Sequence, residues 1–167
     1  FDSLKKSHKR LVYEEFFVLQ TIMAIKRNQK RNKGIKHEIK ENYFNLFKDL
    51  FQFKFTAEQV KCMKEIQEDM SKEKAMYRLL QGDVGTGKTA CAMYALYLAV
   101  NNAHQAAVMA PTEILARQHF VTISKVFMPL GFNVRLLVSG MDEKSKQKVR
   151  KEIASGETEI IIGTHSL

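Results

Sequence analysis

The chain has 167 residues, of which 45% are hydrophobic and 27% are charged. This balance is typical of a globular chain and excludes an intrinsically disordered one, and 8 glycines with 2 prolines exclude a fibrous or low-complexity chain. Lysine and arginine outnumber aspartate and glutamate by 27 to 18, which gives a formal net charge of +9. An excess of that size favours a polyanionic partner, of which nucleic acid is the commonest.

The number of cysteines and the hydropathy of the sequence indicate the kind of cellular compartment. Cys62 and Cys91 are too few for a disulfide framework or a four-ligand metal site, so we expect reduced thiols in packed helix faces. The five histidines lack the spacing of metal ligands. The most apolar stretch, residues 16–25, is interrupted by polar side chains and is too short to span a bilayer. We therefore predict a soluble protein of a reducing compartment with no membrane partner.

Residues 1–50 are predicted to be a basic helical connector. Apolar side chains recur at three- and four-residue intervals between Leu11 and Ile25, which predicts an amphipathic helix, and a second amphipathic stretch spans residues 43–50. The basic run between them, residues 26–34, is predicted as a helix end or a loop that either faces solvent or contacts nucleic-acid phosphates. Phosphate contact can be tested by neutralising Lys26, Arg27, Lys30 and Arg31. If these side chains contact phosphates, DNA binding by the neutralised protein should depend less steeply on salt concentration.

From residue 51 onward, predicted helices alternate with predicted strands. Thr56 and Gln59 form a capping-box signature that opens a helix continuing to Met70. The predicted strands are residues 77–80, 106–110, 134–138 and 159–162, and the helices between them are a stretch that ends at residue 100, 113–127 and 142–154. This alternation favours an α/β fold with a parallel sheet that carries helices on both faces.

A glycine-rich motif lies between the first of these strands and the next helix. It fits the pattern G-x-x-x-x-G-K-[ST] with Gly82, Asp83, Val84, Gly85, Thr86, Gly87, Lys88 and Thr89. Such a loop turns tightly around an anion with its amide hydrogens inward, and the following helix presents its positive end to the same anion. Lys88 would contact the β- and γ-phosphates of a bound nucleotide, and the Thr89 hydroxyl would coordinate Mg²⁺. A glycine-rich connection without a ligand is the alternative.

A phosphate loop identifies a nucleotide site but not an activity, since GTPases, small kinases, transporter ATPases and nucleic-acid motors all use one. Small kinases and GTPases usually place the loop near the start of the chain, whereas here about eighty residues precede it. No Asn-Lys-x-Asp element, which would bind guanine, occurs in the 167 residues. These observations weigh against a small kinase or a switch GTPase and leave a transporter ATPase or a nucleic-acid motor open.

Four stretches in a fixed order resemble one family. They are Phe55-Thr56-x-x-Gln59, residues 79–89, residues 110–119 with Pro111, Thr112 and Glu113, and Ile162-Gly163-Thr164-His165. Over roughly residues 50–167 the chain resembles the first half of the N-terminal motor domain of superfamily-two DNA helicases, most closely the RecG type. A weaker match resembles the helical connector before that motor and involves Arg10, Leu11, Glu14, Glu15, Leu19 and Gln20.

The resemblance implies an incomplete RecA-like P-loop NTPase domain over residues 51–167, preceded by the connector of residues 1–50. It implies an ATP-dependent helicase or translocase of the bacterial cytoplasm that remodels branched or forked duplex DNA at stalled forks and recombination intermediates. Two alternatives stay open: a duplex translocase of the transcription–repair coupling type, and a nucleotide-dependent binding module without motor activity. The coupling type tends to have Cys and Phe where this chain has Gln81 and Thr86. No oligomeric state is predicted.

The resemblance also implies roles for single residues. Lys88 and Thr89 are expected to act in catalysis, and Gln59 is expected to contact adenine, although it is also the capping-box partner of Thr56. Contacts with the DNA backbone are expected from two segments that follow strands, residues 111–113 and 163–165. For Thr112 within the first segment, a plain N-cap role is the alternative.

Both ends of the sequence look cut, because it begins with Phe1 and stops directly after an apolar run. The acidic motif with which the family holds Mg²⁺ and orients water does not occur in these 167 residues. Glu58, Asp83 and Glu113 lack the strand-end context that a substitute would need. We therefore expect the chain alone to bind nucleotide weakly and not to hydrolyse ATP.

Overall fold

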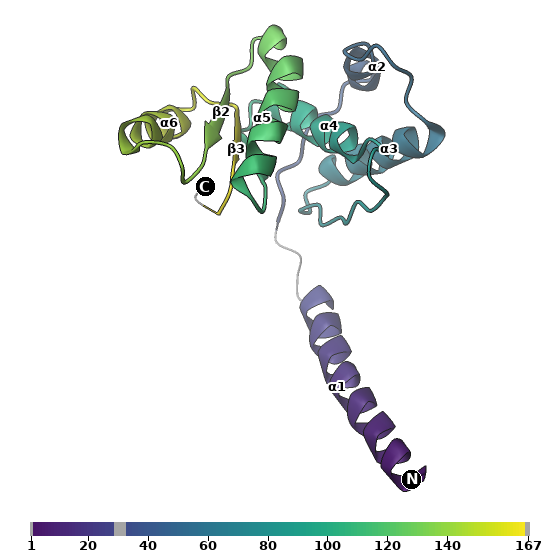
Figure 1. The fold of residues 1–167 in the computed structure, drawn as a ribbon. Coiled ribbons are helices and arrows are strands. Elements are labelled where there is room, and N and C mark those ends of the chain that lie inside the picture. The colour runs from purple at the N-terminus through teal and green to yellow at the C-terminus, as the bar shows by residue number, and fades with distance from the viewer. Residues whose placement is uncertain (1, 29–32, 166–167) are drawn as a thin grey trace.

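The computed structural model describes residues 2–28 and 33–165, with side chains described at 4–25 and 33–165. Helix α1 (Asp2–Asn28) projects away from the other elements, which together form an α/β unit (Figure 1). Every described side chain of α1 is exposed, including its apolar ones. None of the described helices is both long and apolar enough to cross a membrane. The described side chains do not include those of Lys26, Arg27, Lys30 and Arg31, so their contact with phosphates stays a prediction.

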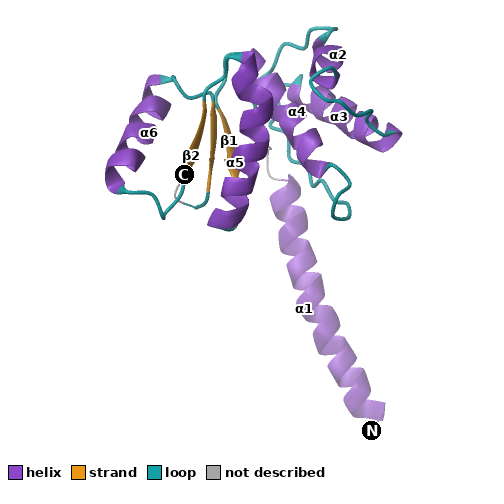
Figure 2. Cartoon of the chain, turned by 45° about the horizontal axis from the view of Figure 1, so that its top comes forward, coloured by secondary structure: helices purple, strands orange, loops and turns teal. Residues whose placement is uncertain are grey.

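Three parallel strands form the sheet in the order β1 (Ala106–Met109), β3 (Ile160–Gly163) and β2 (Val134–Leu137). The central strand β3 reads Ile-Ile-Ile-Gly and is buried along its whole length, as expected for a strand covered on both faces. Figure 2 shows α5 (Glu113–Phe127) on one face of the sheet and α6 (Glu143–Ser155) on the other. The predicted α/β fold, with a parallel sheet and helices on both faces, is confirmed.

Successive residues of β3 face opposite sides of the sheet. Ile160 and Ile162 are fully buried in the main core, which also contains most of α4 (Lys88–Asn101). Ile161 faces the other side, where it packs with Val149 of α6. Nine of the 14 residues of α4 are buried, because this helix is enclosed by its neighbours on nearly all sides. The start of α4 is thereby held firmly at the point where the phosphate loop ends.

Aromatic side chains attach α2 (Tyr43–Lys48) to α4. The ring of the fully buried Phe47 lies 5.0 Å from that of Tyr94, measured between centroids. Helix α3 (Ala57–Met70) packs along α4, and Thr56 completes the capping box predicted at its start. α2 therefore shares a core with α3 and α4, while the domain boundary near residue 50 stays a prediction.

One predicted strand is wrong. The helices and the three later strands predicted beyond residue 55 appear within one or two residues of their expected bounds, whereas α1 begins nine residues before the apolar pattern that predicted it, and residues 77–80 form no strand. Tyr77 and Leu79 in this segment are 90% and 87% exposed. A strand requires a neighbour to complete its hydrogen-bond ladder, and the order β1-β3-β2 places no described strand beside this segment. The apolar run before the phosphate loop is therefore unpaired within the described residues.

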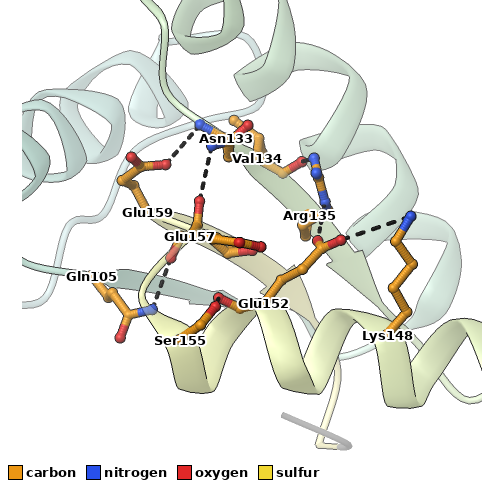
Figure 3. A network of polar contacts seen from close by, with 10 residues as sticks. Gln105, Asn133, Val134, Arg135, Lys148, Glu152, Ser155, Glu157 and Glu159 are labelled. Atoms are coloured by element: carbon orange, nitrogen blue, oxygen red, sulfur yellow. Dashed lines mark hydrogen bonds and ion pairs between the residues drawn. The ribbon is translucent and has the colours of Figure 1, made fainter.

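Polar contacts join α6 to the sheet near the beginnings of the strands, as Figure 3 shows. The side-chain nitrogen of Gln105 donates to the carbonyl oxygens of Ile153 and Thr158 at 2.9 and 2.8 Å. On β2, Nε of Arg135 donates to a carboxylate oxygen of Glu152 at 2.6 Å. These bonds fix the edge where the strands begin, and the candidate functional residues follow the opposite edge.

Candidate functional site

The predicted phosphate loop leads directly into α4. Gly85 and Gly87 have positive φ angles of 83° and 80°, a conformation that costs other residues roughly 1–2 kcal/mol. A Cβ atom at Gly87 would lie 2.3 Å from Nε2 of Gln59, and one at Gly82 would lie 2.9 Å from Oγ1 of Thr86. The glycines of the motif are therefore required both by backbone conformation and by close approach of other groups.

The ammonium group of Lys88 is held by the loop that precedes it. Its Nζ donates to the carbonyl oxygens of Gly82 at 2.7 Å and Asp83 at 2.6 Å. The Thr86 hydroxyl donates to the same Asp83 carbonyl at 2.8 Å, which tightens the turn. Because the N-terminus of a helix carries partial positive charge, Lys88 and the start of α4 concentrate positive charge inside the loop.

Gln59 joins α3 to the phosphate loop. Its Oε1 accepts a hydrogen bond from the backbone N–H of Thr56 at 2.9 Å, and its Nε2 donates to the Thr86 carbonyl at 2.8 Å. The capping role proposed for Gln59 is therefore confirmed, and the same amide group lies against the loop. Contact between Gln59 and adenine stays a prediction that this position favours.

Two cavities adjoin the loop. The first, of about 520 Å³, is lined by α3, the loop and the start of α4, and its predicted nucleotide residues are Gln59, Gly82, Gly85, Thr86 and Lys88. The second, of about 900 Å³, is lined by α3, α4, β1, α5 and the segment before the loop, and it includes Lys88 and Thr89 in its wall. Both volumes fall in the range of small-molecule sites. Of the remaining motif residues, Asp83 contributes its carbonyl group to the loop, and Val84 is fully exposed.

The Thr89 hydroxyl is the group of this site that suits Mg²⁺. Magnesium prefers oxygen ligands and usually keeps several waters while it contacts phosphate oxygens, so a single protein hydroxyl fits its requirements. Within the described residues, no three acidic, histidine or cysteine side chains gather as an all-protein metal site. The residues present therefore fit a magnesium ion held mainly by a bound nucleotide.

The two segments predicted to contact nucleic acid lie side by side. Met109 at the end of β1 is opposite Gly163 at the end of β3, and the Ala110 N–H donates to the Gly163 carbonyl at 2.8 Å. Residues 111–113 and 163–165 therefore leave the same edge of the sheet from neighbouring strands. Gly163 itself is buried and Thr164 is half-buried, whereas the exposed members are Pro111, Thr112 and His165.

Thr112 and Glu113 make different contacts at this edge. The Thr112 hydroxyl oxygen accepts a hydrogen bond from the Leu115 N–H at 3.4 Å, so the N-cap role is confirmed. Glu113 extends to the loop after β2, where Oε2 accepts the Gly140 N–H at 3.0 Å, while Oε1 accepts from Nη2 of Arg117 at 2.7 Å. Hydrogen bonds from Arg117 and Gly140 hold the pKa of Glu113 below its usual range, because they favour the carboxylate.

Sequence reasoning did not identify the loop after β2 as part of this edge. A Cβ atom at Gly140 would lie 2.7 Å from Oε1 of Glu113, so the glycine permits the close approach of the two segments. The available signal was a glycine two residues after a predicted strand. Its partner Glu113, however, lies 27 residues earlier in the chain. We call the bonds among Glu113, Arg117 and Gly140 the Glu113 clamp.

A family profile described as DEAD/DEAH box helicase matches residues 56–167, more than half of the chain. The chain is 38% identical over 161 residues to the ATP-dependent DNA helicase RecG of Aquifex aeolicus, covering 96% of this chain and 20% of that protein. It is 42% identical over 135 residues to the transcription-repair-coupling factor of Borreliella burgdorferi, covering 81% of this chain and 12% of that protein.

A solved structure agrees with these matches. The structure of RecG bound to a three-way DNA junction is similar to this chain with a TM-score of 0.82 and 38% identity, covering 98% of this chain and 23% of that one. The chain therefore spans about a quarter or less of the length of the proteins it matches. The match to the RecG structure includes most of residues 1–50, whereas the match to the coupling factor leaves about a fifth of the chain uncovered.

Proposed function

Because the chain belongs to the DEAD/DEAH box helicase family, we propose that it is the ATP-binding part of an ATP-dependent DNA helicase that acts on branched DNA. The similarity to RecG, and to RecG in complex with a three-way junction, supports DNA as the partner and a branched substrate. The net charge of +9 supports a polyanionic partner as well. The named relatives are bacterial, so we propose the bacterial cytoplasm as its location.

The geometry of the phosphate loop is the observation that carries this proposal. The Lys88 ammonium would exchange the carbonyl oxygens of Gly82 and Asp83 for phosphate oxygens, which form stronger, charge-assisted hydrogen bonds. The first turn of α4 contains no acidic residue that would repel the anion. Gln59, held between Thr56 and Thr86, would then present its free amide hydrogen and lone pair to the adenine edge.

Magnesium would be held by the Thr89 hydroxyl together with the phosphates. When bound, the ion neutralises negative charge that develops on the phosphates during transfer. The contribution of this chain is to hold the β- and γ-phosphates with Lys88 and the loop amides, and to exclude part of the water through the walls of α3 and α4. Positioning and electrostatic stabilisation of this kind account for most of the catalysis in phosphoryl transfer.

The strand-end segments would bind the sugar–phosphate backbone of DNA. The Thr112 hydroxyl accepts the Leu115 N–H as an N-cap, yet it retains its own hydrogen for donation to a phosphate, so the two roles are compatible. Thr164 and His165 lie beside it on the neighbouring strand end. Glu113 would act indirectly, by holding the loop at Gly140, because a carboxylate repels phosphate.

A duplex translocase of the transcription–repair coupling type is the second candidate, and its 42% identity with this chain supports it. We favour the RecG type because similarity to RecG extends over 96–98% of the chain, whereas the match to the coupling factor covers 81% of it. A module that binds nucleotide without motor action is disfavoured by membership of a helicase family.

The test is Lys88→Ala in the complete protein that carries this chain, with ATP hydrolysis measured with and without forked DNA. We expect DNA-stimulated hydrolysis to fall by about 100-fold or more, since the loss of one group that stabilises transferring phosphate has effects of that order. The matched control is Lys125→Ala, an exposed lysine in the last turn of α5. Undiminished hydrolysis in Lys88→Ala would refute the proposal. Hydrolysis without any response to forked DNA would favour the binding module.

A further inference from the structure

The two cysteines of the chain lie together beside the phosphate loop. Cys62 is on α3 and Cys91 is on α4, and both contribute to the wall of the 520 Å³ cavity, next to Gln59 and Lys88. Both are free thiols, and Cys62 is close enough to Cys91 to contribute, after burial, to the raised pKa of the Cys91 thiol. They are separated by 29 positions in sequence, so their proximity is produced by the packing of α3 on α4.

Helix geometry places this pair directly behind the nucleotide residues. Cys62 comes three positions after Gln59, and Cys91 comes three positions after Lys88. Residues three apart on a helix lie on the same face, about one turn from each other. The two thiols are therefore one turn away from the side chains that we assign to adenine and to phosphate.

The two thiols differ in access to solvent. Cys91 is 2% exposed within the main core, and burial raises the pKa of its thiol to about 12, so it remains protonated at neutral pH. Cys62 is half-buried and also lines the 900 Å³ cavity. Because oxidation follows access and thiolate formation, Cys62 is the sulfur that would meet an oxidant first, and Cys91 is positioned to react with the product.

We propose that Cys62 and Cys91 form a redox-active dithiol, which a peroxide converts into a disulfide between α3 and α4. In the first step the Cys62 thiolate attacks a peroxide oxygen, the O–O bond breaks, and the leaving hydroxide takes up a proton to become water. In the second step the Cys91 sulfur attacks the sulfur of the resulting sulfenic acid, the S–O bond breaks, and the Cys91 proton leaves with the hydroxyl group as water. Two thiols are oxidised, and one hydrogen peroxide is reduced to two waters.

The disulfide would weaken nucleotide binding, a consequence that rests on the proposed function of the loop. Gln59 contacts the loop through the Thr86 carbonyl, and Lys88 must release two carbonyl oxygens when phosphate enters. A covalent bond one turn away from both restrains α3 against α4 and opposes this rearrangement. We expect nucleotide affinity to fall on the order of 10-fold on oxidation and to return on reduction, within the range usual for coupled sites.

Disulfide formation is tested by peptide mapping of the complete protein after brief treatment with hydrogen peroxide. Under non-reducing conditions trypsin should release residues 62–64 joined to residues 89–117, because lysine or arginine bounds both segments. This product should disappear after reduction and should be absent from Cys62→Ser, which alters a half-buried position, and from Cys91→Ala. Oxidation of Cys62 to sulfenic or sulfinic acid in the folded protein without any link to Cys91 would overturn the proposal.

Nucleotide affinity provides the second measurement, by titration with a fluorescent ATP analogue before oxidation, after oxidation and after reduction. The wild-type protein should lose and regain affinity, while Cys62→Ser, compared with its own untreated state, should not respond to peroxide. A disulfide that leaves nucleotide affinity unchanged would overturn the regulatory role. The phosphate-loop assignment would stand in that case, because Lys88→Ala tests it separately.

Discussion

The phosphate loop is held in its conformation mainly by main-chain groups, whereas the strand-end edge of the sheet is held mainly by side chains. The loop is defined by its main chain: two glycines have positive φ, and carbonyl groups surround the Lys88 ammonium. The strand-end edge is defined by side chains, since Thr112 caps α5 and Glu113 bridges to Gly140. Substitutions should therefore act on the loop through backbone conformation and on the edge through hydrogen bonding and charge.

The two regions also differ in electrostatics. The loop offers Lys88 and an uncompensated helix start, which attract a compact, highly charged phosphate chain. The strand-end edge offers hydroxyl and backbone groups, and its carboxylate at Glu113 is paired with Arg117. Such an edge suits a partner that is held by many weak contacts along a backbone, as DNA is. The difference predicts that one set of variants weakens nucleotide binding and that a separate set weakens DNA binding.

Among the variants that separate these two regions, the largest effect is expected from Gly87→Ala. An alanine at this position must adopt a positive φ and also place its Cβ 2.3 Å from Nε2 of Gln59. The strain alone costs roughly 1–2 kcal/mol, and each 1.4 kcal/mol is about tenfold in affinity, so strain and displacement of Gln59 together should weaken nucleotide binding by about 100-fold. The measurement is titration of the complete protein with a fluorescent ATP analogue.

Gly85→Ala is the matched control for this prediction. Gly85 has nearly the same φ, 83°, but a Cβ there would meet no atom within 4 Å. It should therefore show the effect of strain alone, about tenfold. Equal losses in the two variants would mean that contact between Gln59 and the loop contributes nothing to nucleotide binding.

Thr112→Asp should produce a smaller effect, which is confined to DNA binding. Aspartate is as good an N-cap as threonine or better, so the free energy of unfolding should change by less than about 1 kcal/mol. Its negative charge would repel a phosphate, and affinity for forked DNA should fall about tenfold at low salt. Electrophoretic titration with forked DNA and thermal unfolding measure the two quantities.

Thr112→Ser keeps both the cap and the donor hydrogen, and it should bind DNA like the wild type. If Thr112→Asp also binds DNA like the wild type, the residue is an N-cap alone. If nucleotide affinity falls along with DNA affinity in Thr112→Asp, the two regions are not separable in the way their construction suggests.

These differences explain which parts the sequence could predict. The phosphate loop was predicted residue by residue because its eight positions are contiguous and each glycine reports a backbone requirement. The Glu113 clamp and the Cys62–Cys91 pair were not predicted, since their partners are brought together only by folding. The thiols were expected as free groups in packed faces, and that is confirmed, but nothing in the pattern indicated their proximity.

The wrong strand at residues 77–80 has the same origin. An apolar run predicts a strand only if another strand is available beside it, and pairing is a property of distant segments. Helices α1 and α4 show a second limit of prediction from sequence, which concerns burial. Both were predicted from apolar patterning, yet α4 is enclosed in the core while the described side chains of α1 are exposed. Periodicity predicts a helix, and it does not identify what covers the apolar face.

The smallest expected effect is a pH dependence of the Glu113 clamp. Hydrogen bonds from Arg117 and Gly140 lower the pKa of Glu113 in the folded state below its ordinary value of about 4.5. For a group with a lowered pKa, the stabilisation is fully present above the unfolded-state value and is lost as pH falls through the folded-state value. Hydrogen–deuterium exchange of the Gly140 amide should therefore show constant protection above the ordinary pKa of 4.5 and declining protection as pH falls below it, relative to the Gly156 amide, which bonds to the Ile153 carbonyl and has no carboxylate partner. In Glu113→Gln the ratio of the two should be independent of pH, and a ratio that is equally flat in the wild type would show that the clamp does not order the loop.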